Sequence, residues 1–207
     1  MRKYYFCIDK RGLLFNDEFI KNGLRNIATA LKDKTFLDVT FKMLRPLKAN
    51  DYLIHNDHKY THISPCRSEV NYIRCLDPNA SLVFTSLRPR SQSQNNSREQ
   101  NKDRNEEGEE DVLTYGGNLT HPFDINSLRV SDGYLYHKIT HHRHLQYTYG
   151  LLHPDIAFYL TSNEQYSENE NENDPVHQEK MEEDTDSVNI NYKGQNHIIY
   201  DKKLEWK

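Results

Sequence analysis

Four histidines gather in one short stretch of the chain and raise the question of a metal site. His137, His141, His142 and His144 lie close together, and the first two have the i, i+4 spacing with which a helix can chelate a metal ion. The stretch follows a predicted strand, it lacks an H-E-x-x-H motif, and no cysteine pair has zinc-ribbon spacing. We therefore predict a solvent-exposed loop without a bound metal.

The other residue types that commonly carry out catalysis form no recognisable arrangement. The chain has no G-x-S-x-G elbow, no Walker A motif and no G-x-G-x-x-G motif. Cys66 and Cys75 are not part of a C-x-x-C motif, and a nucleophilic thiol also needs a lowered pKa and a base. We expect buried, reduced cysteines in strands, no catalytic residue and no cofactor.

Two segments hold most of the polar excess. The 207 residues include 27 Lys+Arg and 31 Asp+Glu, and only 35% of them are hydrophobic. Segments 88–111 and 163–187 have few large apolar residues, so we predict disordered inserts within one domain, residues 1–207. The second segment is strongly acidic, and the remaining chain is net positive. The acidic segment either keeps a basic domain soluble or covers a basic face in competition with an anionic partner.

Aromatic and basic residues leave nucleic-acid binding as an alternative. The 14 Tyr and 8 Phe, with a net positive remainder, resemble a stacking surface for bases. The basic residues are dispersed, however, and the RNP pattern of RNA-recognition strands is absent. We therefore expect no nucleic-acid partner.

No apolar run approaches the ~18 residues of a membrane helix, so we also expect no membrane span.

Periodicity and turn signals predict an α+β fold. The expected order is a hairpin of strands at 3–9 and 12–15, helices at 17–31 and about 33–44, strands between 60 and 136, a helix at 154–160, and a hairpin at 188–200. Helices and strands do not alternate strictly, which disfavours a doubly wound fold. We predict a mixed, mostly antiparallel sheet with two N-terminal helices and one late helix.

Short blocks along most of the chain resemble one family. The blocks are Tyr4–Phe15 (YYFCIDKRGLLF), Phe36–Leu37, Leu44–Pro46, Asn71–Asp77 (NYIRCLD), Val83–Thr85, Leu113–Gly117 (LTYGG), Pro122–Phe123, Gly133–His137 (GYLYH), Ala157–Leu160 and the 188–200 hairpin. In this order they resemble the uncharacterised protein family 0598, a domain of unknown function found in animals.

The resemblance implies a location and a fold, but no activity, because the family has none established. Longer members carry an Arg-rich leader that resembles a mitochondrial presequence. The resemblance therefore implies a mitochondrial protein, and because this sequence lacks that leader, the cytoplasm is the alternative. A fainter similarity to a bacterial family of unknown function implies a β-roll-like sheet.

The blocks also point to candidate binding residues. Arg45 and Arg74 could each hold a carboxylate or phosphate through two hydrogen bonds. Asp77, Tyr136 and His137 could complete a polar pocket. The alternative is that Arg74 and Asp77 form a structural ion pair.

Three further residues in these blocks are turn candidates. Asp9, Gly12 and Gly133 are expected to set turns. The leading hypothesis is a non-enzymatic domain that binds a protein partner or a small anionic ligand. The alternatives are an enzyme that uses Arg74, Asp77, Tyr136 and His137, and an RNA-binding protein.

Overall fold

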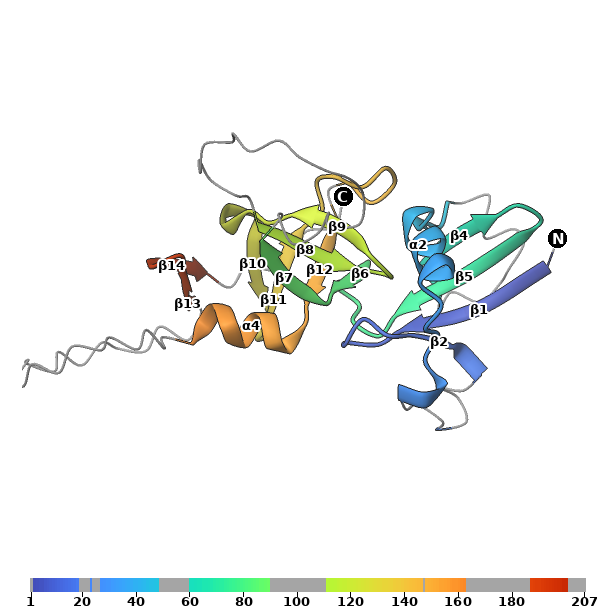
Figure 1. Ribbon diagram of the computed structural model, residues 1–207, viewed down its shortest axis with the longest axis horizontal. Helices are drawn as coiled ribbons and strands as arrows, with labels where there is room; N and C mark the ends of the chain where they lie inside the picture. Colours follow the sequence, from blue (N-terminus) through green and yellow to red (C-terminus); the bar gives the residue numbers. More distant parts are fainter. Residues whose placement is uncertain are drawn as a thin grey trace, which may run out of the picture.

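The computed structural model describes residues 2–18, 23, 27–48, 60–89, 111–146, 148–162 and 187–200. Of these residues, 49% lie in strands and 18% are helical. The strands form sheets of five, four, three and two strands (Figure 1). The predicted α+β fold with one β-roll-like sheet and two N-terminal helices is therefore wrong, because the described chain is mostly β-structure divided among several sheets.

The N-terminal strands form the five-stranded sheet, in the order β2-β1-β5-β4-β3. The strands are β1 (Arg2–Ile8), β2 (Leu14–Asn16), β3 (Arg45–Pro46), β4 (His62–Cys66) and β5 (Glu69–Cys75). β1 pairs with β2 as the expected antiparallel hairpin. Its other edge runs parallel to β5 along its whole length, so a segment far along the chain completes the sheet.

Helix α2 (Lys34–Lys42) covers one face of this sheet (Figure 1). Asp33 caps the helix, because its Oδ1 accepts the N–H of Phe36 at 2.7 Å. The ring of Phe36 meets that of Phe6 in β1 edge-on, with centroids 5.9 Å apart. This helix is the second of the two expected from the sequence, and it ends before Pro46 as predicted.

The first expected helix does not extend over residues 17–31: residues 17 and 18 are helical, but the described residues from Gly23 onward are not in an α-helix. Gly23 has a φ of +70°, which a right-handed helix does not contain, and Ile27–Thr29 forms only the short 3-10 helix η1. The N–H of Leu31 then donates to the carbonyl of Leu14 at 2.8 Å, so the chain follows β2 here. Residues 19–22 and 24–26 lie outside the described residues.

Two facing sheets form the second half of the chain, with the orders β10-β11-β12-β6 and β7-β8-β9. The elements are β6 (Leu82–Phe84), β7 (Ser86–Pro89), β8 (Asp111–Tyr115), β9 (Leu119–Pro122), η3 (Ile125–Ser127), β10 (Leu128–Ser131), β11 (Tyr134–Lys138) and β12 (Tyr149–Leu152). The ring of Phe84 contacts those of Tyr115 and His121 across the sheets, with centroids 5.8 and 5.5 Å apart. The same buried cluster includes Ile8 and Leu14 of the first sheet.

A late helix and a hairpin complete the described structure (Figure 1). They are α4 (Pro154–Thr161) and the strands β13 (Ser187–Tyr192) and β14 (Gln195–Tyr200), all close to their predicted positions. Ile156 and Leu160 bury one side of α4, whereas Phe158 and Tyr159 are 70% and 63% exposed. Neither α4 nor any other described helix has the length and apolar character needed to cross a membrane.

The two predicted inserts lie mostly outside the described residues, which omit 90–110 and 163–186. Their ends do have structure: Arg88 and Pro89 belong to β7, Asp111 begins β8 and Ser187 begins β13. The predicted inserts therefore reach slightly too far, into paired strands, and their disorder stays a prediction.

The turn between β1 and β2 lies against the second half of the fold. Asp9 is fully buried, and its Oδ1 accepts the N–H groups of Arg11 and Leu13 at 3.0 and 2.9 Å. Gly12 has a φ of +81°, and a Cβ at this position would come within 2.6 Å of Cγ2 of Thr85, the residue after β6. The turn therefore requires a residue without a side chain at its contact with β6.

Replacing this glycine is expected to loosen the contact. Gly12→Ala combines a strained φ with a clash against Thr85, and should lower the free energy of unfolding by about 1–3 kcal/mol. Thr85→Ser removes the clashing methyl and keeps the hydroxyl, which donates to the Thr114 carbonyl. The double variant should therefore recover part of the loss. Urea unfolding of all four proteins measures this coupling, and strictly additive effects would contradict it.

Candidate functional site

Arg74 lies in a largely buried ion pair, and its partner is Asp17. The Arg74 Nη2 and Nε lie 2.8 and 2.9 Å from Asp17 Oδ1, and the Tyr60 hydroxyl donates to Oδ2 at 2.9 Å. Asp17 is fully buried, so its charge needs this compensation. The expected pairing of Arg74 with Asp77 is therefore wrong, because Arg74 already neutralises a carboxylate beyond the end of β2.

Asp77 and Tyr136 do meet, at the junction of the two halves of the fold. The Tyr136 hydroxyl lies 3.2 Å from each carboxylate oxygen of Asp77, which also accepts the N–H of Asn79 at 2.9 Å. Burial, aided by the charge of Asp77, raises the pKa of Tyr136, so the hydroxyl stays protonated and donates. Lys10 Nζ lies 3.9 Å from Asp77 Oδ2. This network holds Asp77 beside Lys10.

His137 is buried in β11 beside His121 of β9, with ring centroids 5.2 Å apart. The N–H of Asp124 donates to Nε2 of His137, and the N–H of Thr140 donates to Nε2 of His121, both at 3.0 Å. An accepting ring nitrogen carries no proton, so both rings are neutral. Burial lowers the pKa of each to about 4.

The predicted exposed histidine loop is wrong for part of the cluster. His142 is only 5% exposed, because its Nε2 donates to the Phe41 carbonyl at 2.9 Å and its Nδ1 accepts the N–H of Leu145 at 3.1 Å. His141 is exposed. The buried rings of His121 and His142 therefore form hydrogen bonds with the backbone of the segment that follows β11. Within the described ranges, no group of three or more His, Cys, Asp and Glu side chains is placed to hold a metal ion.

Neither Ser81 nor Cys75 is arranged as a nucleophile. Ser81 Oγ lies 3.1 Å from Nε2 of His62, but the other ring nitrogen meets Thr61 Oγ1 at 2.9 Å, where a catalytic triad has a carboxylate. Ser81 and His62 are also both buried. Burial raises the pKa of the Cys75 thiol to about 12, so little thiolate forms at neutral pH.

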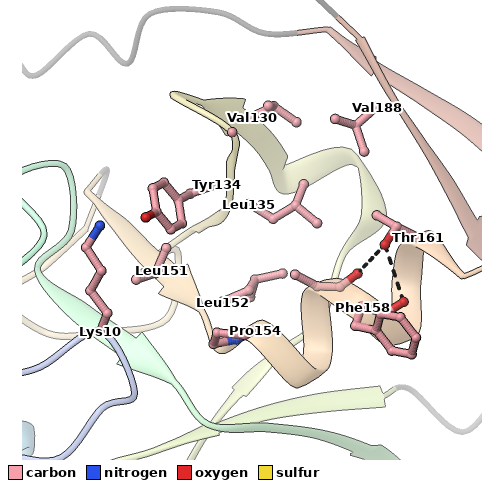
Figure 2. Close-up of a pocket in the computed structure, with 12 residues that line it drawn as sticks. Lys10, Val130, Tyr134, Leu135, Leu151, Leu152, Pro154, Phe158, Thr161 and Val188 are labelled. Carbon is pink, nitrogen blue, oxygen red and sulfur yellow. Dashed lines mark hydrogen bonds between the residues drawn. The ribbon is translucent and has the colours of Figure 1, made fainter.

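A mostly apolar cavity of about 460 Å³ lies between the four-stranded sheet, α4 and the β1–β2 turn. Figure 2 shows Lys10 and Tyr134 at one end, and Phe158 and Thr161 at the other. The lining is made by Lys10, Val130, Gly133, Tyr134, Leu135, Leu151, Leu152, Pro154, Ala157, Phe158, Thr161 and Val188. The volume falls in the range of ~300–1,000 Å³ that is typical of small-molecule sites.

Lys10 is the one charged side chain among these lining residues. Its Nζ lies 4.0 Å from the centroid of the Tyr134 ring, as in a cation–π contact. Hydrogen bonding to Tyr134 raises the pKa of Lys10, so the ammonium is charged at neutral pH. The side chain is 41% exposed, and a bound molecule can therefore reach it.

None of the five predicted binding residues lines this cavity. Arg45 donates to the carbonyl of Pro46 in the edge strand β3, while Arg74 and His137 lie in the separate contacts described above. Asp77 is linked to the cavity through Lys10, and Tyr136 through Asp77.

Sequence reasoning missed both Lys10 and the cavity. The one available signal was a basic residue within the Asp9–Gly12 turn, because the apolar lining cannot be told from ordinary core positions. Gly133, expected only to set a turn, has a φ of +74° and also lines the cavity.

Comparisons with known proteins agree with an uncharacterised family. The model of a domain of unknown function, DUF4505, matches residues 1–192. No solved structure matches the chain. Neither comparison indicates a substrate, ligand or partner, so the functional conclusion rests on the geometry above.

The buried neutral histidines predict a loss of stability in mild acid. Histidine in an unfolded chain has a pKa of ~6.5, whereas burial lowers the pKa of His62, His121 and His137 to about 4 in the fold. Between these values the unfolded chain binds more protons. The free energy of unfolding is therefore fully maintained above pH ~6.5 and falls toward pH ~4, by at most ~1.4 kcal/mol per pH unit for each histidine.

Urea unfolding between pH ~4 and ~7 measures this slope. His121→Gln should make the slope shallower, because one buried titrating group is removed. Asn196→Gln, which changes an exposed residue that does not titrate, should leave the slope as in the parent protein. A slope that His121→Gln does not alter would contradict the assignment of His121 as a buried neutral ring.

Proposed function

We propose that this protein, which belongs to the DUF4505 family, is a non-enzymatic domain that binds a small, mostly apolar molecule. The observation that carries the proposal is the cavity of about 460 Å³ between the four-stranded sheet and α4. Leucine side chains from two neighbouring strands form its wall, and burying apolar ligand surface against them is favourable at ~25 cal/mol per Å². The ligand would lie along Leu135, Leu151 and Leu152 (Figure 2).

The positions of the candidate polar residues favour binding over catalysis. Arg74 is engaged with Asp17, and His137 accepts a backbone hydrogen bond within the core. Asp77 and Tyr136 satisfy one another at the junction of the sheets. The residues of the enzyme alternative thus lie in separate contacts, without a shared site that includes a nucleophile and a base.

We also propose that the protein belongs more closely with the uncharacterised protein family 0598 and acts in mitochondria. The ordered short blocks, from Tyr4–Phe15 to the hairpin at 188–200, support this proposal. Fractionation of the protein's own cells should recover it with the mitochondrial matrix or membranes. Recovery in the cytosolic fraction alone would contradict the location.

A neutral fluorescent probe, 1-aminoanthracene, tests the cavity directly. We expect saturable binding of one probe per chain, with an increase in fluorescence as the probe enters the apolar site. Ala157→Trp places an indole in the cavity from a half-buried helix position, so it should weaken binding about tenfold or more. Thermal unfolding checks that this variant is folded.

Tyr159→Trp provides the matched control on the same helix. Tyr159 is 63% exposed and does not line the cavity, so an indole at this position should leave probe binding unchanged. The proposal fails if the parent protein does not bind the probe saturably, or if a folded Ala157→Trp variant binds it as well as the parent does.

A further inference from the structure

The cavity differs sharply between its two ends. At one end the Lys10 ammonium lies against the Tyr134 ring, and at the other the lining consists of α4 residues, including Phe158 (Figure 2). Between them the wall is apolar, apart from the backbone. A ligand that matches this lining has one polar end and an apolar body.

Lys10 is able to accept a second negative partner. Its present contact with Asp77 is long, at 3.9 Å from Nζ to Oδ2. An ammonium group has three N–H donors, so the Tyr134 side chain and one distant carboxylate do not use all of them. Because 41% of the side chain is exposed, a further donor can turn toward the cavity with little rearrangement.

Asp77 does not depend on Lys10 alone for its stabilisation. The Tyr136 hydroxyl and the Asn79 N–H both donate to its carboxylate, at 3.2 and 2.9 Å. A bound anion can therefore share Lys10 without leaving Asp77 buried and unpaired. The Asp77 side chain, only 3% exposed, would stay behind Lys10 as a fixed negative charge.

That fixed charge limits how much negative charge the ligand can carry. Asp77 lies beside the ammonium, and Asp132 is linked to the same region through Asn79 Nδ2, 3.4 Å from its Oδ2. A dianionic phosphate would face these carboxylates with a single lysine to offset it. The lining also holds no guanidinium, the group whose paired donors best match a phosphate.

We propose that the cavity binds an amphipathic monocarboxylate, a medium-chain fatty acid in chemical class. Its carboxylate would pair with Lys10 Nζ at the Tyr134 end. Its alkyl chain would lie along Leu135, Leu151 and Leu152 toward Phe158. This inference rests on the proposed binding function and adds the ligand class and the residue that recognises it.

Displacement of 1-aminoanthracene from the full chain tests the ligand class. The competitors are dodecanoate, dodecanol, dodecylamine and dodecyl phosphate, each below its aggregation concentration. We expect dodecanoate to bind about tenfold more tightly than dodecanol, since its carboxylate can form a charge-assisted hydrogen bond with the Lys10 ammonium. Lys10→Met keeps an apolar stem of similar length, so it should remove this preference and leave dodecanol binding unchanged.

Two further variants separate charge at the site from charge elsewhere. Lys10→Arg retains the positive charge and should keep the preference for dodecanoate. Lys32→Met removes the same charge from an exposed residue that does not line the cavity, and should have no effect. Dodecanol binding by Lys10→Met shows that the variant is folded.

The outcomes distinguish this inference from the function on which it rests. The ligand class is wrong if dodecanoate and dodecanol bind equally well, or if Lys10→Met keeps the preference for dodecanoate. In either case, saturable probe binding would still support the proposed binding function. Tighter binding of dodecylamine or dodecyl phosphate also overturns it. If no competitor displaces the probe and Ala157→Trp does not weaken probe binding, the proposed function fails as well.

Discussion

The buried carboxylate of Asp9 accepts hydrogen bonds from the turn that follows β1. This turn packs against the second half of the chain, so its position determines how the two halves meet. The backbone N–H groups of Arg11 and Leu13 both donate hydrogen bonds to its Oδ1. The turn then brings Gly12 against Thr85 and extends Lys10 toward the four-stranded sheet. One local set of hydrogen bonds therefore places both a close packing contact and the charged end of the cavity.

Most buried polar side chains in the described structure have partners that fix them. Asp17 is held by Arg74 and Tyr60, and Asp77 is held by Tyr136. The ring nitrogens of His121 and His142 bond to backbone groups. A polar group engaged in this way has little capacity left for substrate, since breaking its contacts costs the full desolvation of the group. These contacts hold the buried polar side chains in place.

Lys10 differs from these groups because it lies at the surface end of an apolar cavity with a distant counter-ion. The Tyr134 ring and the Asp77 carboxylate both lie close to its ammonium, and 41% of the Lys10 side chain stays exposed. A preorganised, accessible charge beside apolar walls is the common design of small-molecule sites, in which the walls supply affinity and a few polar groups supply specificity. Because Lys10 comes from the first hairpin and the leucines from β11 and β12, the site exists only when both halves are folded together.

The sequence by itself determined the local elements whose signals lie within a few residues. It predicted the first hairpin, the helix capped by Asp33, the helix that begins at Pro154 and the last hairpin, because caps, prolines and alternation act locally. It failed at residues 17–31, where apolar spacing matched a helix but Gly23 takes a positive φ and Leu31 bonds to β2.

Only the tertiary structure decided which residues became neighbours. Parallel pairing of β1 with β5, the contact of Arg74 with Asp17 rather than Asp77, and the burial of His137 and His142 all join segments that are distant in the chain. The cavity is the clearest case, because its apolar lining carries the same residue types as the core. Composition and spacing predict which side chains are buried. They do not predict where a cavity forms, because the space left between packed elements depends on their three-dimensional fit.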